Sequence, residues 1–147
     1  MRRRSELCAF KFKDIANAPN GKPIIKLNFS KTDQYGAGEV LPISEELLTL
    51  LHQWKEIVAS ENYILRSINR YEHIGNNLNP ASVSIILKGL QSNLDIASTQ
   101  QSLSGHSFRV GAALDLLVQG ESIEKIMLKG GWQTESTAMK YLRSWHF

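Results

Sequence analysis

The sequence predicts an α+β fold that is predominantly helical, with a small antiparallel sheet near the N-terminus. Two patterns predict this fold. Short segments rich in β-branched and apolar residues flank a glycine-containing turn early in the chain, and apolar residues at helical spacing follow them. The 147 residues are enough to bury a hydrophobic core. Because no repeat or Pro-, Gly- or Ser-rich linker interrupts the chain, we expect a single domain over residues 1–147.

The predicted sheet comes first. Residues 24–29 and 39–43 are typical of two strands that form an antiparallel hairpin. Gly36-Ala37-Gly38 supplies a turn between them, and Lys31 is expected near the hairpin tip. Residues 9–15 are expected to add a third strand.

The predicted helices follow the hairpin. The first has Ser44 as its N-cap, and four apolar residues recur along one face: Leu47, Leu51, Trp54 and Val58. A second is expected from Asn79-Pro80, because proline suits the first helical position. We expect a third over residues 107–119, ended by Gly120, and a fourth from the N-cap Ser122 to Gly130-Gly131. Thr134 is expected to start a fifth.

Charge is spread unevenly along the chain. The net charge is +3, yet residues 1–31 carry +6, residues 32–103 carry −4, and the remainder carries +1. A basic opening segment can face phosphates, because Lys and Arg neutralise them and release counterions. It can equally be a solvated, frayed terminus, and on charge alone that second interpretation is slightly favoured.

Composition excludes several classes of protein. The single cysteine, Cys8, excludes a disulfide scaffold and any Cys-cluster metal site. No apolar run approaches the length needed to span a membrane. The polar pair Ser5-Glu6 stands where a signal peptide would become apolar. We therefore expect a soluble cytoplasmic protein that does not bind membranes.

His106 and Arg109 form one candidate for phosphate chemistry. Their spacing of three places both side chains on the same side of a helix start. A histidine donor and a forked guanidinium can together hold a phosphate. Taken alone this pair is a weak signal, since short patterns match by accident.

Two aromatic residues near the C-terminus are also candidates. Trp132 follows Gly130-Gly131, which is typical of a helix stop before a core tryptophan, although an indole N–H can also donate to a phosphate oxygen. Tyr141 stands between Lys140 and Arg143. Most such tyrosines pack, but a tyrosine surrounded by cationic donors can attack a phosphodiester.

The candidate residues are a stronger signal when their order and spacing are considered together. They are separated by 28, 75, 3, 23 and 9 residues: Arg3, Lys31, His106, Arg109, Trp132 and Tyr141. In this order they resemble the tyrosine recombinases, the phage integrase family, and particularly its Cre-like members. The resemblance covers almost the whole chain. Its motifs are Arg3-Arg4-Ser5-Glu6-Leu7, Ser30-Lys31-Thr32, the box from Ser104 to Ala113, Gly130-Gly131-Trp132, and Tyr141.

The resemblance implies a helix-rich catalytic domain that cuts and rejoins double-stranded DNA without a metal or other cofactor. Tyr141 would be the nucleophile, forming a 3′-phosphotyrosyl bond. The other implied roles are phosphate contacts for Arg3 and Arg109, proton transfer or donation for His106, donation for Trp132, and protonation of the leaving 5′-oxygen for Lys31. Glu6 would orient these groups or be an ordinary surface carboxylate. Further DNA contacts are expected from Arg2, Arg4, Lys140 and Arg143.

Some features depart from the family pattern. Most members carry histidine where this chain has Trp132, and tryptophan is the Cre-like choice. Since Arg3 lies so near the start, we expect the N-terminal core-binding domain to be absent. Six residues follow Tyr141, so we expect the tetramer that a full-length synapse needs to be difficult for this chain. The resemblance otherwise implies a nucleoid-associated recombinase or integrase, as in mobile elements.

Three alternatives to a recombinase remain. A type IB topoisomerase shares the tyrosine, arginine and lysine chemistry but relaxes supercoils. A truncated or non-catalytic remnant would bind DNA without forming a covalent bond. In the last alternative each candidate residue merely packs or caps, and six residues in order make that improbable.

Overall fold

The computed structural model describes residues 2–28, 38–93 and 103–143. These residues fall into two compact units, one formed by residues 5–80 and the other by residues 1–4 and 81–147. We call them the sheet unit and the helical unit and describe each by itself. None of the described helices is long and apolar enough to cross a membrane.

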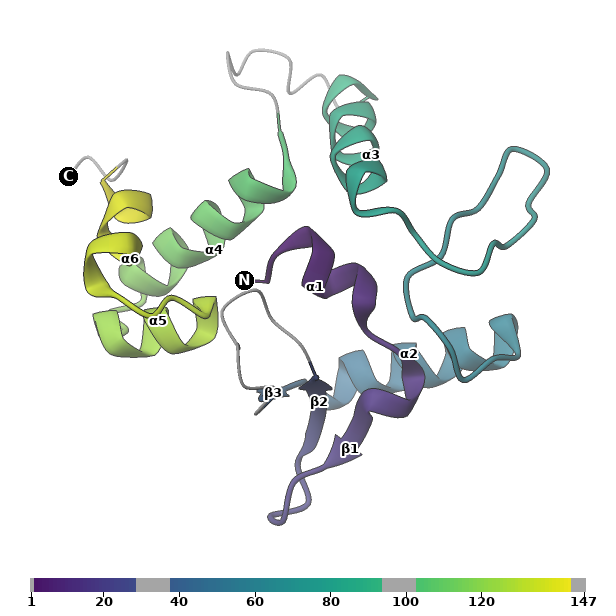
Figure 1. Ribbon diagram of the computed structural model, residues 1–147, viewed down its shortest axis with the longest axis horizontal. Coiled ribbons are helices and arrows are strands. Elements are labelled where there is room, and N and C mark those ends of the chain that lie inside the picture. Colours follow the sequence, from purple (N-terminus) through teal and green to yellow (C-terminus); the bar gives the residue numbers. More distant parts are fainter. Residues whose placement is uncertain (1, 29–37, 94–102, 144–147) are drawn as a thin grey trace. The chain divides into compact units, whose positions relative to one another are not determined.

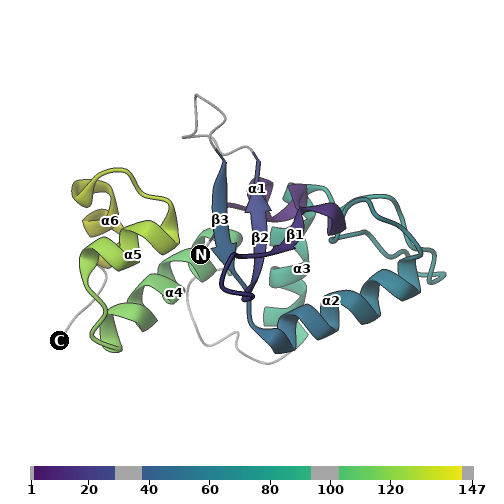
Figure 2. The same cartoon turned by 90° about the horizontal axis from the view of Figure 1, so that it is seen from below.

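The sheet unit contains three antiparallel strands in the order β1-β2-β3 (Figure 2). They span Ile15–Asn17, Pro23–Leu27 and Glu39–Pro42. In β2 only Lys26 is exposed, as expected for a central strand whose apolar residues enter the core. Ile25 pairs with Ile15 on one side and with Leu41 on the other. The predicted hairpin of residues 24–29 and 39–43 is thus confirmed in its strands, whereas Lys31 and most of its turn lie outside the described residues.

Helix α2, Glu45–Val58, follows β3 in the sheet unit (Figure 1), and some of its apolar residues pack against the core of that unit. The predicted N-cap is confirmed, since the backbone N–H of Leu47 donates to Ser44 Oγ at 3.1 Å. Five buried residues make up this core, and Leu51, Trp54 and Val58 pack against them: Phe10, Phe12, Ile25, Leu27 and Ile64. The predicted apolar face is thus confirmed at Leu51, Trp54 and Val58, whereas its fourth residue, Leu47, is 43% exposed.

The chain before β1 differs from the prediction. Residues 9–15 were expected to form a strand, but they contain the end of α1, Arg4–Ala9, and a 3₁₀ helix, Phe12–Asp14. The buried Asp14 carboxylate explains the turn, because it accepts hydrogen bonds from Lys11 N and Asn28 Nδ2, both at 2.8 Å. The third strand follows this turn as β1.

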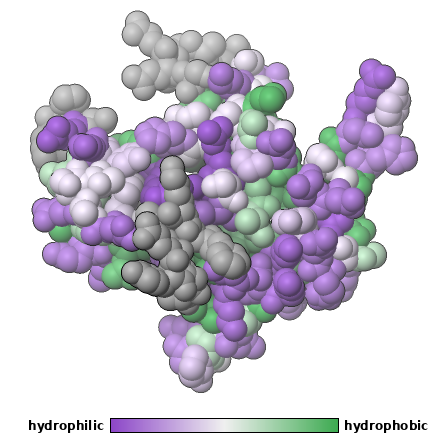
Figure 3. All heavy atoms as spheres, in the orientation of Figure 1, coloured by the Kyte–Doolittle hydropathy of each residue, from purple (hydrophilic) through white to green (hydrophobic). Residues whose placement is uncertain are grey.

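A loop connects α2 to Pro80 and closes the sheet unit. Near its start the loop pairs with the chain after α1, since Ile64 N donates to Phe10 O at 2.9 Å. Its tip projects from the unit, with Asn69 Oδ1 accepting from the backbone N–H groups of Tyr71 and His73. The side chains of the tip are mainly hydrophilic on the face seen in Figure 3.

The helical unit contains four helices among its described residues. They are α3, Pro80–Asn93; α4, Gly105–Val118; α5, Ile123–Gly130; and α6, Glu135–Leu142. α3 begins at the predicted proline, and its Pro80 stands at the edge of the sheet unit. Helices α4, α5 and α6 pack together around a compact core (Figure 1). The buried residues of that core are Ala113, Ile126, Trp132, Ala138 and Leu142.

Helix α4 begins two residues before its predicted start at Ser107. The side chains of Ser104 and Ser107 each accept a hydrogen bond from the other residue's backbone N–H, at 3.3 and 3.2 Å. This reciprocal capping makes Ser104 the N-cap. The predicted starts of α5 and α6, after Ser122 and Thr134, are confirmed.

Candidate active site

Arg109 is buried in the helical unit, although arginine is almost never buried unless it has partners. It stands in the second turn of α4. Its Nη2 donates to the Gly130 carbonyl at 2.5 Å, and the guanidinium lies 4.8 Å from the centre of the Trp132 ring. The end of α5 and a tryptophan ring therefore hold this cation in place.

The turn after α5 positions Trp132. Gly131 adopts a left-handed conformation with φ of 62°, which turns the chain back so that Trp132 N donates to Met127 O at 3.0 Å. The indole then covers Gly130 so closely that a Cβ there would collide with the ring. Gly130 thus supplies both the surface under Trp132 and the carbonyl that holds Arg109.

Tyr141 brings α6 into the same cluster. Its ring centre lies 5.0 Å from those of both His106 and Trp132. The Arg109 guanidinium lies 6.0 Å from the same ring. His106 is exposed and Tyr141 is half-buried, so the cluster reaches the surface of the unit. Four of the predicted site residues, from three separate segments, are therefore neighbours.

The indole N–H of Trp132 is buried, and no hydrogen-bond acceptor for it occurs among the described residues. Buried polar groups almost always have a partner, since leaving one unpaired costs about 1–3 kcal/mol. The packing of Trp132 is consistent with the core tryptophan that its position also suggested. An unpaired buried N–H is unusual for a residue that serves packing alone.

The N-terminal arginines have different environments. Arg3 belongs to the helical unit and is half-buried, as is Arg2. Arg4 is exposed, and its Nη1 donates to Ser84 Oγ of α3 at 2.7 Å. The other two residues expected to contact DNA, Lys140 and Arg143, are also exposed.

Two other predicted residues are described apart from this cluster. Lys31 lies outside the described residues. Glu6 belongs to the sheet unit and is only 4% exposed, so the alternative that it is an ordinary surface carboxylate is wrong. Its orienting role stays a prediction.

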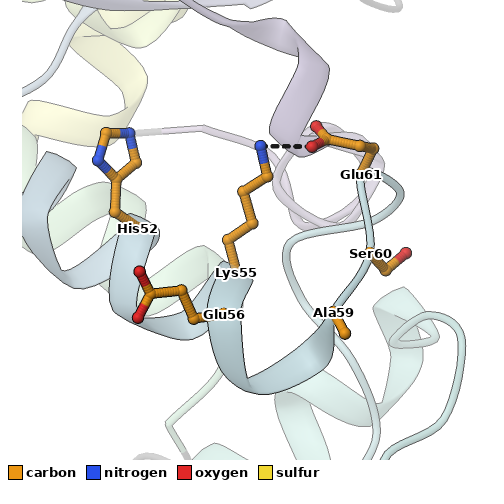
Figure 4. Close-up of a pocket in the computed structure, with 6 residues that line it drawn as sticks. All are labelled: His52, Lys55, Glu56, Ala59, Ser60 and Glu61. Carbon is orange, nitrogen blue, oxygen red and sulfur yellow. Dashed lines mark ion pairs between the residues drawn. The ribbon is translucent and has the colours of Figure 1, made fainter.

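A cavity of about 550 Å³ occurs elsewhere, at the end of α2 in the sheet unit (Figure 4). An ion pair joins two of its lining residues, Lys55 and Glu61, at 2.5 Å. None of the predicted site residues lines it. Within the described ranges no three His, Cys, Asp or Glu side chains are grouped so that they could hold a metal ion.

Comparison with known proteins is consistent with this arrangement. The model of the phage integrase family matches residues 1–146. The chain belongs to the phage integrase family. The box from Ser104 to Ala113 and the cluster around Tyr141 both lie within the matched residues.

One relative of known name shows a modest sequence identity to this chain. The chain is 27% identical over 155 residues to the recombinase Cre of Escherichia phage P1, a match that covers 97% of this chain and 45% of Cre. It therefore spans a little under half the length of that relative.

Solved structures show the same fold. The XerA recombinase has a TM-score of 0.69 at 19% identity, covering 95% of this chain and 46% of XerA. The Tn1549 transposon integrase, in complex with circular intermediate DNA, has a TM-score of 0.62 at 14% identity, covering 95% and 50%. The XerH recombinase bound to its difH substrate has a TM-score of 0.61 at 20% identity, covering 99% and 39%. The predicted fold class is confirmed.

Sequence reasoning missed two residues that shape the site. Gly130 was recognised as part of a helix stop and of a family motif, but not as the residue whose carbonyl holds Arg109. Ser84 was not considered at all. The doublet Gly130-Gly131 offered a signal for the first, because a glycine before the left-handed Gly131 indicates a close approach as well as a turn.

Proposed function

We propose that residues 1–147 are the catalytic domain of a site-specific DNA recombinase that cleaves and rejoins double-stranded DNA through a phosphotyrosyl intermediate. The observation that carries the proposal is the cluster of Tyr141, His106, Arg109 and Trp132 in one unit. A nucleophile, a proton-transfer group and fixed donors are what cleavage of a phosphodiester requires.

The proposed reaction begins at Tyr141. Its hydroxyl oxygen attacks the scissile phosphorus, the bond from phosphorus to the 5′-oxygen breaks, and the 3′-phosphate stays on the tyrosine. The phenolic proton passes to a base, for which we propose the imidazole of His106, whose ring centre lies 5.0 Å from that of Tyr141. The leaving 5′-oxygen takes a proton from Lys31. A 5′-hydroxyl of another strand reverses these steps, so no external energy source is needed.

The cations and the indole act on the charge that develops at phosphorus. Arg109 is held from the side by Gly130 and from its face by Trp132, so the pentacoordinate transition state needs little rearrangement of this donor. Arg3 is proposed as the second guanidinium on the non-bridging oxygens. The buried Trp132 N–H, which has no acceptor among the described residues, is proposed to donate to a phosphate oxygen.

The same proposal includes partners and location. Double-stranded DNA is the substrate, a homotetramer is the assembly in which two strands exchange, and the nucleoid is the place of action. The exposed Lys140 and Arg143 flank the nucleophile and would contact the DNA backbone.

Covalent trapping tests the proposal. The chain is incubated with sheared DNA from its source organism, denatured in detergent and digested with nuclease, and peptides are searched by mass spectrometry for a nucleotide adduct. We expect the adduct on the Tyr141 peptide, its loss in Tyr141→Phe, and its retention in the control Tyr71→Phe, since Tyr71 is exposed in the sheet unit.

Other outcomes would assign a different function. Salt-sensitive DNA binding with no adduct would make the protein a DNA-binding remnant of a recombinase. An adduct accompanied by supercoil relaxation, without strand exchange, would make it a topoisomerase. An adduct in Tyr141→Phe would show that another residue is the nucleophile.

A further inference from the structure

We infer that Arg4 is a positioning residue, which docks the segment that carries Arg3 onto α3 and α4. The inference rests on the proposed function, because positioning matters only if Arg3 holds the scissile phosphate. Arg4 was expected to contact DNA, as its charge and its place in a basic segment suggested. In the structure its side chain contacts Ser84 and Gly105.

Two separate contacts fix the Arg4 side chain. At its tip, Nη1 donates to Ser84 Oγ, 80 positions away on α3, at 2.7 Å. Along its stem, Cγ and Cδ lie against Gly105, the first residue of α4, so closely that a Cβ on Gly105 would collide with both carbon atoms. One side chain thereby joins the N-terminal segment, α3 and α4, all within the helical unit.

The neighbours of these two residues are the reason that the contact matters. Arg3 is bonded directly to Arg4, and His106 is bonded directly to Gly105. Adjacent Cα atoms are held about 3.8 Å apart by the planar peptide. Contact between Arg4 and Gly105 therefore limits how far Arg3 can move from the helix start that carries His106 and Arg109. A displacement of about 1 Å in a reacting group can reduce a rate about a hundredfold.

Glycine at position 105 allows a test that keeps the charge of Arg4. In Gly105→Ala the new methyl group must displace the Arg4 stem, while alanine suits a helix better than glycine does. The matched control is Gly111→Ala in the same helix, where an added Cβ meets nothing within 4 Å. Ser84→Ala removes the contact at the tip.

The docking itself is measured without any activity. Trypsin can cut after Arg4 in every variant named above, and a docked segment resists cleavage. We expect release of residues 1–4 to be roughly fivefold faster in Gly105→Ala and Ser84→Ala than in Gly111→Ala, as loss of one hydrogen bond or its equivalent in packing implies. Equal cleavage in Gly105→Ala and Gly111→Ala would overturn the inference.

The positioning is measured by the rate of Tyr141 adduct formation at saturating DNA. We expect adduct formation to be slower by roughly ten- to a hundredfold in Gly105→Ala, Ser84→Ala and Arg4→Ala. DNA affinity should be unchanged in the first two. Arg4→Lys should form the adduct faster than Arg4→Ala but more slowly than the wild type. Were Arg4 a phosphate contact, only Arg4→Ala would act, lowering affinity and reducing the salt slope by about one. That result would overturn the inference, as would faster trypsin cleavage with unchanged adduct rates.

Failure of the wild-type chain to form an adduct would reject the proposed function instead. The trypsin measurement would still show whether Arg4 docks the N-terminal segment.

Discussion

Trp54 and Trp132 both pack into cores, but their indole N–H groups have different environments. In the sheet unit, Trp54 Nε1 donates to the Ile64 carbonyl at 2.7 Å, so the ring serves both packing and hydrogen bonding. In the helical unit, Trp132 is 6% exposed, and its N–H has no acceptor among the described residues. The comparison separates a tryptophan that completes its own fold from one that leaves a donor for something else.

The same contrast extends to the buried charges. Asp14 of the sheet unit is satisfied by backbone and amide donors from its own unit. Arg109 of the helical unit is held by one carbonyl and by the face of an aromatic ring, beside a half-buried tyrosine. The buried Asp14 of the sheet unit stabilises a turn, whereas the buried Arg109 of the helical unit lies beside the proposed nucleophile, Tyr141.

Arg109→Lys should have the largest effect of the changes that test this contrast. Lysine cannot present two parallel N–H donors or stack flat on Trp132, so the developing phosphate charge would lose its principal donor. We expect the rate of Tyr141 adduct formation to fall about a hundred- to a thousandfold. The measurement is single-turnover adduct formation at saturating DNA, with Lys88→Arg as a control for charge exchange at an exposed position of α3. Near-normal turnover would remove Arg109 from the site.

Replacing each tryptophan by phenylalanine tests the contrast directly. The two changes delete the same atoms, but only Trp54→Phe also removes a hydrogen bond within the described residues. Trp54→Phe leaves the Ile64 carbonyl without its donor and should lower the free energy of unfolding by about 1–3 kcal/mol more than Trp132→Phe does. Trp132→Phe should slow adduct formation by up to about a hundredfold, while Trp54→Phe leaves it nearly unchanged. The measurements are urea unfolding and adduct kinetics.

The reverse outcome would break the comparison. If Trp132→Phe were the more destabilising variant and neither change affected the adduct rate, Trp132 would be a core residue and nothing more. Its unpaired N–H would then be a tolerated defect of packing.

Local sequence signals account for most of the fold. Ser44, Ser122 and Thr134 marked helix starts because a cap acts within a few residues, and β2 and β3 were visible as apolar segments around a turn. Helix α1 was missed because six residues are too few to show periodicity, and its burial of Glu6 and Cys8 depends on tertiary packing. β1 was placed too early because the turn before it is set by Asp14, which bonds to Asn28 fourteen positions later.

The site was predicted from a family resemblance, which rests on short motifs together with the order and spacing of the site residues. His106, Arg109, Trp132 and Tyr141 are neighbours in the structure, yet no pair except the first two is close enough in sequence to indicate contact. The supporting contacts could not be predicted, since Arg4 reaches Ser84 across 80 positions and Arg109 reaches Gly130 across 21. Such contacts depend on how helices pack.

Gly130→Ala should slow adduct formation less than Arg109→Lys or Trp132→Phe does. The added methyl group must displace the Trp132 ring, although alanine is the better helix former, so we expect a loss of about 1–3 kcal/mol in the free energy of unfolding. We also expect a roughly tenfold slower adduct rate, because the ring and the carbonyl on Arg109 move together. The matched control is Gly89→Ala in α3, where the added Cβ meets nothing within 4 Å. Equal behaviour of the two variants would contradict the close packing at Gly130.

The smallest effect is expected from an ion pair at α5. Its charges are exposed to solvent, unlike the buried donors compared above. Lys125 Nζ lies 2.8 Å from Glu121 Oε2, and Lys129 Nζ lies 3.6 Å from Oε1. The hydrogen bond from Lys125 lowers the pKa of Glu121 below its usual value. A lowered pKa means that the stabilisation is present above the usual pKa of glutamate, about 4.3, and is lost as pH falls through the folded value. The thermal midpoint of the wild type should therefore exceed that of Glu121→Gln slightly at pH 7 and meet it near pH 3, with the difference shrinking in high salt because these charges are screened. A difference that persists at pH 3 would show that the glutamine variant loses packing rather than charge.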